Sequence, residues 1–109
     1  MKFITSTIDG LIIIEPSIYL DHRGYFLETF NQKKLEKFID NIKFVQDNES
    51  KSSKGVLRGL HFQKPDFAQA KLVRCIEGEV MDVVVDIRKK SSTYGKYFSI
   101  ILSGENKRQ

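Results

Sequence analysis

Short runs of apolar residues separated by turn residues dominate this chain, and such a pattern predicts β-strands. A compact apolar run at residues 11–14 ends near Pro16, and a second run at 25–30 follows a turn signal at 21–24. Further extended runs are predicted at 44–48, 56–63, 70–77, 79–88 and 97–102. Many short strands without internal repeats or linkers favour an all-β fold, either a β-sandwich, a barrel or a jelly roll.

One segment between Asn31 and Asn41 has a helical period instead. Its apolar residues recur at the spacing i, i+3, i+4 and i+7, and they are Leu35, Phe38, Ile39 and Ile42. Asn31 is a residue type that often caps the start of a helix. The sequence therefore predicts a single short helix in an otherwise strand-rich chain.

Two of the predicted strands flank Gly78, which favours a tight hairpin between them. A two-residue turn would place Asp82 opposite Val73, close enough diagonally to pair with Lys71. A three-residue turn would place Asp82 opposite Arg74 instead, and the sequence alone leaves this register open. Asp82 is thus a candidate acid partner for a functional lysine, with a plain salt bridge as the alternative.

The length and composition describe one small globular domain that spans residues 1–109. No apolar run approaches the ~20 residues that a bilayer crossing requires, and the first residues lack the features of a signal peptide. The single cysteine, Cys75, cannot form an internal disulfide, which fits a reducing compartment. We therefore expect a cytoplasmic protein that does not interact with membranes.

The net charge of +4, from 18 basic and 14 acidic residues, suits an anionic ligand such as a nucleotide or a nucleic acid. A basic nucleic-acid-binding barrel is disfavoured, because the aromatic residues fall mostly at core-type spacings and no recognition motif interleaves them with basic residues. We therefore expect the partner to be a small anionic ligand, and we do not expect the protein to bind nucleic acid.

A glycine at position 55, followed six positions later by His61, resembles the opening of the cupin metal motif. The second histidine of that motif is Gln63 here, and its glutamate position holds Lys71. An ammonium group and a lone histidine do not hold a divalent ion, so a metal-dependent cupin is disfavoured. We expect no metal and no other cofactor.

Without a metal, these residues suit the removal of a proton next to a carbonyl group. A neutral imidazole at His61 can act as the base, and Lys71 can stabilise the oxyanion that forms. Arg23 and Arg58 carry guanidinium groups that match phosphate oxygens. Considered alone, each of these residues also has a purely structural interpretation. The histidine can be a hydrogen-bonded structural residue, and the arginines can be ordinary surface residues.

Six motifs of the chain resemble those of the dTDP-4-dehydrorhamnose 3,5-epimerases. They stand in the family's order, cover nearly the whole chain, and include D-x-R-G-x-F-x-E at 21–28, F-x-Q-x-N at 44–48, L-R-G-L-H-F-Q at 57–63, Q-x-K-L-V-R at 69–74, G-E-V-x-D-V-x-V-D-I-R at 78–88 and an S-P-T-F-G-like turn at 91–95. In that turn Ser92 replaces the usual proline and Tyr94 the usual phenylalanine. Chance agreement is not a serious rival to this resemblance.

The resemblance implies a cupin-type jelly roll that forms a homodimer and acts on a dTDP-linked 4-keto-6-deoxy sugar, in dTDP-L-rhamnose biosynthesis. In such enzymes the histidine at the position of His61 removes the C3 and C5 protons, and the lysine at Lys71 stabilises the enolate. The remaining residues implied to contact the substrate are Arg23 and Arg58 at the diphosphate, Glu28, Gln46, Asp47 and Asn48 at the nucleotide, and Tyr19 near the base.

Family members continue beyond the position of Gln109, into an element with the pattern W-I-P-x-G-x-x-H-G-F. That part carries the tyrosine that donates a proton and the aspartate that pairs with the base. We therefore expect a jelly roll that is incomplete at its C-terminal side, and little epimerase activity from these 109 residues alone. The alternative function is a non-catalytic remnant of the same fold that binds a nucleotide sugar.

Overall fold

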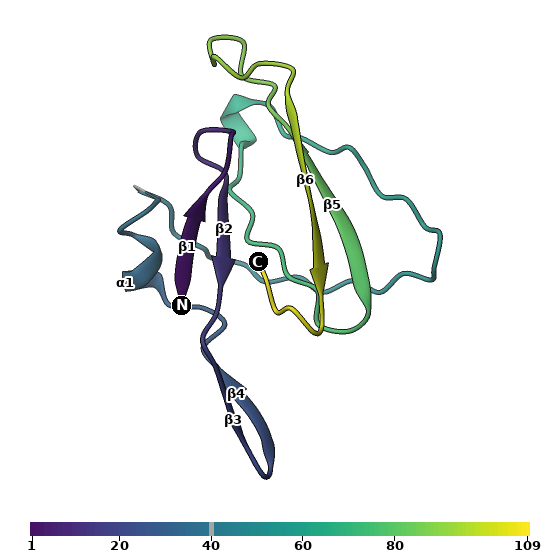
Figure 1. The fold of residues 1–109 in the computed structure, drawn as a ribbon. Helices are drawn as coiled ribbons and strands as arrows, with labels where there is room; N and C mark the ends of the chain where they lie inside the picture. The colour runs from purple at the N-terminus through teal and green to yellow at the C-terminus, as the bar shows by residue number, and fades with distance from the viewer. Residues whose placement is uncertain (40) are drawn as a thin grey trace.

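The structure is a computed structural model, and it describes residues 1–39 and 41–109. In these residues the strands pair into three separate antiparallel sheets of two strands each (Figure 1). The prediction of a strand-rich chain with one short α-helix is confirmed. Over the described ranges the strands do not close into a sandwich or barrel, so the chain holds the parts of such a fold and not its closed form.

The first sheet pairs β1 (Lys2–Thr5) with β2 (Ile12–Glu15), and Phe3 lies opposite Ile14. Three consecutive isoleucines favour the extended backbone of β2, because β-branched side chains pack well on a pleated surface. In the connecting loop the Ser6 hydroxyl accepts a hydrogen bond from the backbone N–H of Ile8 at 3.0 Å. The apolar run was correctly predicted to be extended, whereas its partner β1 was not predicted.

The second sheet is a hairpin of β3 (Ile18–Asp21) and β4 (Gly24–Leu27), which we call the arm. The predicted turn at 21–24 is confirmed, because the Asp21 carboxylate accepts from the backbone N–H of Arg23 at 2.8 Å and Gly24 takes a φ of +130°. The arm packs against no other described helix or strand, and it projects from the rest of the chain (Figure 1).

The helix α1 (Gln32–Leu35) begins where the sequence predicted, because the Asn31 side chain accepts from the backbone N–H of Lys34 at 3.2 Å. It is shorter than the predicted span to Asn41, which has a left-handed φ of 58° that a continuing helix does not allow. The last predicted turn also includes Asp40, which lies outside the described residues. The ring of Phe38 still stacks on Phe3, with 4.1 Å between the ring centroids, although Phe38 remains 48% exposed.

The third sheet pairs β5 (Glu79–Val85) with β6 (Tyr97–Ser103), and Asp82 lies opposite Ile100. The predicted strand at 97–102 is confirmed, but the predicted hairpin between 70–77 and β5 is wrong. Gly78 does turn the chain, with a φ of +72°, yet its carbonyl accepts from the backbone N–H of Gly104 at the far end of β6. Gly78 therefore continues the register of the β5–β6 pair and does not form a tight turn between two paired strands.

Gly104 lies directly against the chain that precedes β5. A Cβ atom at this position would lie 2.6 Å from the backbone carbonyl oxygen of Ile76 and 3.2 Å from the Cα of Glu77. This glycine therefore permits a close approach between the end of β6 and the segment that leads into β5.

Between α1 and β5 the chain runs through residues 43–78 in extended and looped backbone with one short 3₁₀ helix, η1 (Pro65–Phe67). The strands predicted at 44–48, 56–63 and 70–77 are wrong as ladder strands, since none pairs with a neighbour among the described residues. Phe44 packs edge-to-face against Phe30, but most of the apolar side chains in these segments are exposed, and Leu57 is 90% exposed. Neither helix of the described ranges has the length and apolarity to cross a bilayer.

The whole chain is more open than a compact domain of its size. Its radius of gyration is 15.1 Å, where about 13 Å is typical of 109 residues in a single domain. Its accessible surface is 9441 Å², against about 6,200 Å² for a compact protein of this mass. The buried apolar side chains of the described residues are few, and they are Ile8, Ile14, Leu35 and Leu102.

Candidate active site

The residues predicted to bind or transform a substrate lie in three parts of the structure. Three are on the arm or at its base, six lie on the long segment at 43–78, and one lies on β5. The members are Tyr19, Arg23 and Glu28 at the arm, Gln46, Asp47, Asn48, Arg58, His61 and Lys71 on the segment, and Asp82 on β5. Within the described ranges, no hydrogen bond joins a residue of one group to a residue of another. Gln46 and Asn48, which belong to the same group, are hydrogen-bonded to each other.

At the tip of the arm, Arg23 is held by a neighbouring carboxylate. Its Nη2 and Nε atoms donate to Asp21 Oδ2 at 2.6 and 3.0 Å, and this pairing holds the pKa of Asp21 below its usual range. The Arg23 side chain is 79% exposed, so solvent screens the ion pair and the pair adds little stability. Its main effect is to fix the direction of the guanidinium group.

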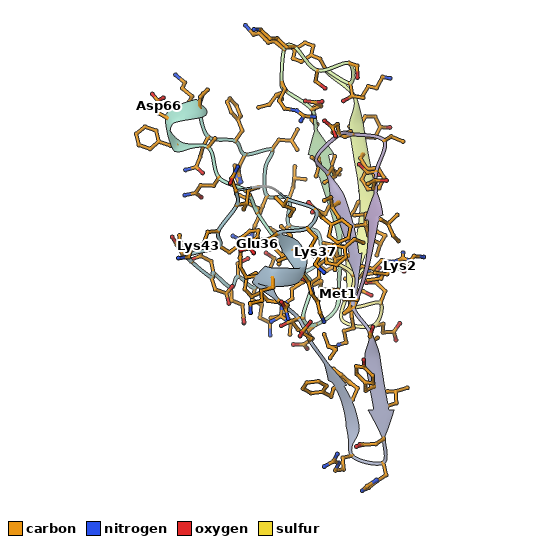
Figure 2. All side chains as sticks on the ribbon, turned by 90° about the vertical axis from the view of Figure 1, so that its left-hand side faces the viewer. Met1, Lys2, Glu36, Lys37, Lys43 and Asp66 are labelled. Carbon is orange, nitrogen blue, oxygen red and sulfur yellow. The ribbon has the colours of Figure 1, made fainter. Side chains whose placement is uncertain are left out.

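The aromatic residues of the arm are also exposed. Tyr19 and Phe26 lie opposite each other with ring centroids 6.5 Å apart, on one face of the hairpin. Leu20 and Tyr25 lie opposite each other on the other face. The tip of the arm projects away from the rest of the molecule (Figure 2), while at its base the Tyr25 hydroxyl accepts a hydrogen bond from Lys107.

Glu28, at the base of the arm, takes part in the start of α1. Its Oε1 accepts from Lys34 Nζ at 2.6 Å and its Oε2 accepts from Asn31 Nδ2 at 3.0 Å. The hydrogen bond from Lys34 and then that from Asn31 hold the pKa of Glu28 below its usual range. Glu28 is therefore ionised at neutral pH and is directed toward the helix cap.

On the long segment, Gln46 and Asn48 share one side of an extended stretch, because residues two apart point the same way. Gln46 Nε2 donates to Asn48 Oδ1 at 3.0 Å, while Asp47 points to the other side. Arg58 folds back over its own loop, where it donates to the Ser52 hydroxyl at 2.9 Å and to the Lys51 carbonyl at 3.1 Å.

His61 and Lys71 are both exposed, and neither makes a hydrogen bond or an ion pair to another described residue. The register prediction that placed Asp82 beside Val73 or Arg74 is wrong, since Asp82 lies opposite Ile100. The role of Asp82 as a partner of Lys71 stays a prediction. Within residues 1–39 and 41–109, no three metal-ligating side chains gather at one point.

A hollow of about 250 Å³ lies at the base of the arm, between β4, residues 74–76 and residues 107–109. On its rim Lys107 Nζ lies 4.6 Å from the centre of the Tyr25 ring and donates to the Tyr25 hydroxyl at 2.9 Å. None of the proposed catalytic residues lines this hollow, so it is not the site of the chemistry that the motifs predict.

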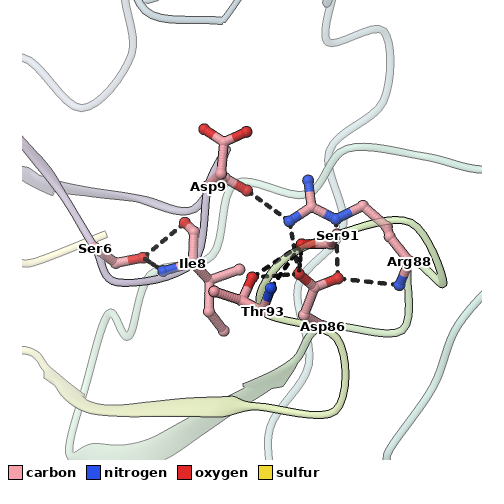
Figure 3. A network of polar contacts seen from close by, with 7 residues as sticks. All are labelled: Ser6, Ile8, Asp9, Asp86, Arg88, Ser91 and Thr93. Carbon is pink, nitrogen blue, oxygen red and sulfur yellow. Dashed lines mark hydrogen bonds and ion pairs between the residues drawn. The ribbon is translucent and has the colours of Figure 1, made fainter.

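A buried carboxylate that the motifs do not single out organises the loop between β5 and β6 (Figure 3). The side chain of Asp86 is fully buried, and it accepts from Arg88 Nε and Nη2 at 2.9 and 2.8 Å and from the hydroxyls of Ser91 and Thr93 at 2.6 Å each. Arg88 is the main cause, followed by Ser91 and Thr93, of a pKa for Asp86 far below its usual range. The spacing D-x-R-x-x-S-x-T at residues 86–93 is the pattern in the sequence from which this cluster could have been predicted.

Comparison with known proteins places these elements in a wider context. The model of one family, described as dTDP-4-dehydrorhamnose 3,5-epimerase, matches residues 5–109. A protein of that description from Shigella flexneri is 56% identical over 110 residues, which cover 100% of this chain and 61% of the relative.

Solved structures agree over the same length. A dTDP-4-dehydrorhamnose 3,5-epimerase from Elizabethkingia anophelis matches with a TM-score of 0.94 and 54% identity, over 100% of this chain and 60% of the other. A dTDP-6-deoxy-D-glucose-3,5-epimerase from Legionella pneumophila, solved in complex with dTDP-4-keto-L-rhamnose, matches with a TM-score of 0.93 and 54% identity, over 99% of this chain and 57% of the other.

The fold and the order of motifs thus define a nucleotide-sugar epimerase chain. It belongs to the dTDP-4-dehydrorhamnose 3,5-epimerase family. The chain spans about 60% of the length of the relatives it matches, and it corresponds to their N-terminal portion.

Proposed function

We propose that this chain is part of a dTDP-4-dehydrorhamnose 3,5-epimerase, which inverts C3 and C5 of dTDP-4-keto-6-deoxyglucose. The observation that carries the proposal is the match along the whole chain, at 56% identity, with the L-R-G-L-H-F-Q element intact at 57–63. This element supplies the base, and the Q-x-K-L-V-R element at 69–74 supplies the lysine.

The chemistry follows from the acidity of protons next to a ketone. His61, as a neutral imidazole, takes the proton from C3 or C5, and the electron pair moves onto the C4 oxygen to form an enolate. The Lys71 ammonium stabilises this oxygen while it is negative. Return of a proton to the opposite face of the same carbon completes the inversion, and the group that delivers it lies outside these 109 residues.

Arg23 and Arg58 are proposed to bind the diphosphate, and Tyr19, Glu28, Gln46, Asp47 and Asn48 to seat the nucleotide. The relative from Legionella pneumophila holds dTDP-4-keto-L-rhamnose, which supports a ligand of this chemistry for the present chain. The Asp21 contacts that orient Arg23 support an anion-binding role, since they leave one edge of the guanidinium free for a phosphate oxygen. No metal or organic cofactor is part of the proposal.

We further propose that the chain forms a homodimer, and that the arm lies in the interface. Both faces of the arm carry large apolar side chains, and Leu20 and Phe26 are 80% and 70% exposed. An isolated two-stranded hairpin is marginal in water, so a covering surface would stabilise it. Cys75 is a half-buried free cysteine with no second cysteine to pair with in the chain, which supports a reducing, cytoplasmic setting.

A second candidate function is binding of the nucleotide sugar without turnover. The observation that favours it is the exposure of His61 and Lys71, neither of which has a described acid partner. A base without an orienting partner lacks a fixed tautomer, which slows proton transfer more than it weakens binding.

The experiment that tests the proposal follows deuterium from D₂O into C3 and C5 of dTDP-4-keto-6-deoxyglucose by NMR. The 109-residue chain is expected to exchange these protons slowly and to form little isomerised product. His61→Asn is expected to remove the exchange, while His22→Asn, the same change at the other histidine, is expected to leave it intact.

Equal exchange by both histidine variants would contradict the assignment of His61. Calorimetry with dTDP separates the second candidate, because binding without any exchange supports a non-catalytic chain. Brisk isomerisation by the 109 residues alone would contradict the view that the proton donor lies elsewhere.

A further inference from the structure

A tight turn folds the chain back on itself just before Arg58. The backbone N–H of Val56 donates to the Ser53 carbonyl at 3.3 Å, and Gly55, the third residue of this turn, takes a φ of +86°. A positive φ at the third position fits a type II turn, and glycine adopts it without a steric cost. The turn therefore returns Arg58 to the residues that precede it.

Arg58 is held in this loop by one edge of its guanidinium group. Its Nε donates to the Ser52 hydroxyl at 2.9 Å, and its Nη2 donates to the Lys51 carbonyl at 3.1 Å. Nε and Nη2 lie on the same edge of the planar group, so the other edge, formed by Nη1 and Nη2, keeps two parallel N–H donors. Two such donors match two oxygens of a phosphate group.

The positive charge of Arg58 is not compensated within the loop. Both of its hydrogen-bond partners are neutral groups, and the ion pairs of residues 1–39 and 41–109 all involve other side chains. Lys51 and Lys54 add two further positive charges, and residues 50–58 contain no carboxylate. A guanidinium that is oriented but not neutralised keeps its full attraction for an anion.

Arg23 on the arm offers a comparison within the same chain. It is held by the same two nitrogen atoms, Nε and Nη2, but both donate to the carboxylate of Asp21. That carboxylate compensates the charge of Arg23 while it fixes the direction of the guanidinium group. Of the two arginines, Arg58 is therefore the one whose partners orient it without weakening its attraction for an anion.

We propose that Ser52 is a positioning residue for the diphosphate group of the substrate, because its hydroxyl holds the guanidinium of Arg58 with one edge open. The inference rests on the proposed function, which supplies a ligand with a diphosphate group. An arginine side chain loses rotamer freedom when it binds a phosphate, and one that is already held loses less. Ser52 thus strengthens binding through Arg58 and does not itself contact the ligand.

A purely structural role for Ser52 leads to a different expectation. Ser52 and Arg58 are both exposed, and their segment pairs with no strand in the described part of the chain. Loss of the Ser52 hydroxyl removes one exposed hydrogen bond, so it should leave the fold unchanged. A change in anion affinity on removal of this hydroxyl is then an effect on Arg58 itself.

The experiment measures the binding of inorganic pyrophosphate and of dTDP to the 109-residue chain by calorimetry. Ser52→Ala is expected to weaken both about fivefold, because the ligand must then bring the Arg58 side chain into order. Ser52→Thr keeps a hydroxyl and is expected to restore the native affinity. Ser53→Ala is the matched control, since Ser53 contributes its backbone carbonyl to the turn and alanine keeps that carbonyl.

A second readout follows Arg58 in the absence of any ligand. In ¹⁵N-labelled chain, the Nε–H of Arg58 exchanges with solvent more slowly while it is hydrogen-bonded, and Arg58→Lys identifies its signal by removing it. Ser52→Ala is expected to speed this exchange, whereas Ser52→Thr and Ser53→Ala are expected to leave it as in the native chain.

Equal affinities of Ser52→Ala and Ser53→Ala for pyrophosphate would overturn the proposal. An unchanged exchange of the Arg58 Nε–H in Ser52→Ala would also overturn it, and so would the absence of pyrophosphate binding by the native chain.

Deuterium exchange at C3 and C5 of the 4-keto sugar keeps this proposal distinct from the proposed function. Pyrophosphate binding that depends on Ser52, together with no exchange at either carbon, would support the positioning role and contradict the epimerase. Exchange by the native chain, with dTDP binding equally tight in Ser52→Ala, would support the epimerase and overturn the role of Ser52.

Discussion

Arg88 and Asp9, which lie 79 positions apart, are joined by a hydrogen bond of 2.9 Å from Nη2 of the guanidinium to the backbone carbonyl oxygen. The same nitrogen atom also donates to the carboxylate of Asp86 at 2.8 Å (Figure 3). Because β1–β2 and β5–β6 share no ladder, this arginine is a direct link between the first hairpin and the last. The link depends on the buried carboxylate of Asp86, because this carboxylate holds the Arg88 guanidinium in place.

Replacing this carboxylate should therefore destabilise more than its own loop. In Asp86→Asn the charge that holds Arg88 and the hydroxyls of Ser91 and Thr93 is lost, and one amide nitrogen faces groups that already donate. We expect the midpoint of thermal unfolding to fall by about 5 °C or more. Circular dichroism measures this, with Asp66→Asn on exposed η1 as the matched control, which should change little. A midpoint equal to that of the control would contradict the structural role of Asp86.

Acid should also remove the stabilisation that the ionised carboxylate of Asp86 provides. The pKa of Asp86 is lowered in the folded chain by Arg88, so the unfolded chain binds the proton more readily as the pH falls. The stabilisation is thus fully present above the unfolded value of about 3.8 and declines below it, toward the lower folded value. Unfolding midpoints measured from pH 6 to pH 2 should fall more steeply for the native chain than for Asp86→Asn. Parallel curves would show that other carboxylates dominate.

The arm supplies a prediction about assembly. Leu20→Asp places a charge on an exposed apolar face that the proposed homodimer would bury, so we expect the dimer to dissociate at least tenfold more readily. Sedimentation velocity over a range of concentrations measures this. Phe67→Asp makes the same kind of change on exposed η1, away from the arm, and serves as the control. An unchanged dimer in Leu20→Asp would show that the arm lies outside the interface.

Local signals in the sequence found several elements correctly. The apolar run of β2, the turn at 21–24, the cap at Asn31 and the strand β6 depend on residues close in sequence, and all are present. The prediction failed where pairing joins distant residues. β5 pairs with β6 and not with 70–77, because the loop organised by Asp86 returns the chain 11 residues later, between Val85 and Tyr97. The D-x-R-x-x-S-x-T spacing that follows β5 is a local sign of this loop, but it does not state which strand β5 pairs with.

The candidate site also divides into features that local sequence predicts and features that depend on distant residues. The motifs locate His61 and Lys71 within the chain, but they do not state which surfaces cover them. Strands at 56–63 and 70–77 were predicted from runs of apolar residues between turn signals, but such a run forms a ladder only when a neighbouring strand is available to pair with it. The Asp86 cluster was harder to find, because its importance comes from burial and a link to Asp9 that no short spacing encodes.

The close contact at Gly104 gives a steric prediction. Gly104→Ala would place a methyl group 2.6 Å from the carbonyl oxygen of Ile76, so the backbone must shift. We expect a loss of about 1–3 kcal/mol in the free energy of unfolding. Urea unfolding measures it, with Gly55→Ala as the comparison, since a Cβ there meets nothing within 4 Å and only its φ of +86° is unfavourable. A loss of less than about 0.5 kcal/mol in Gly104→Ala would show that the contact at Ile76 relaxes easily.

The unpaired backbone of residues 43–78 has a consequence for affinity. A nucleotide that contacts Gln46 and Arg58 must bring into order a segment that no ladder holds in place, and each residue fixed in this way costs conformational entropy. The measured dissociation constant for dTDP will then include the free energy of ordering this segment. Whatever pairs with the segment beforehand will tighten nucleotide binding without touching the nucleotide, so the affinity for dTDP becomes a measure of how completely the fold has formed.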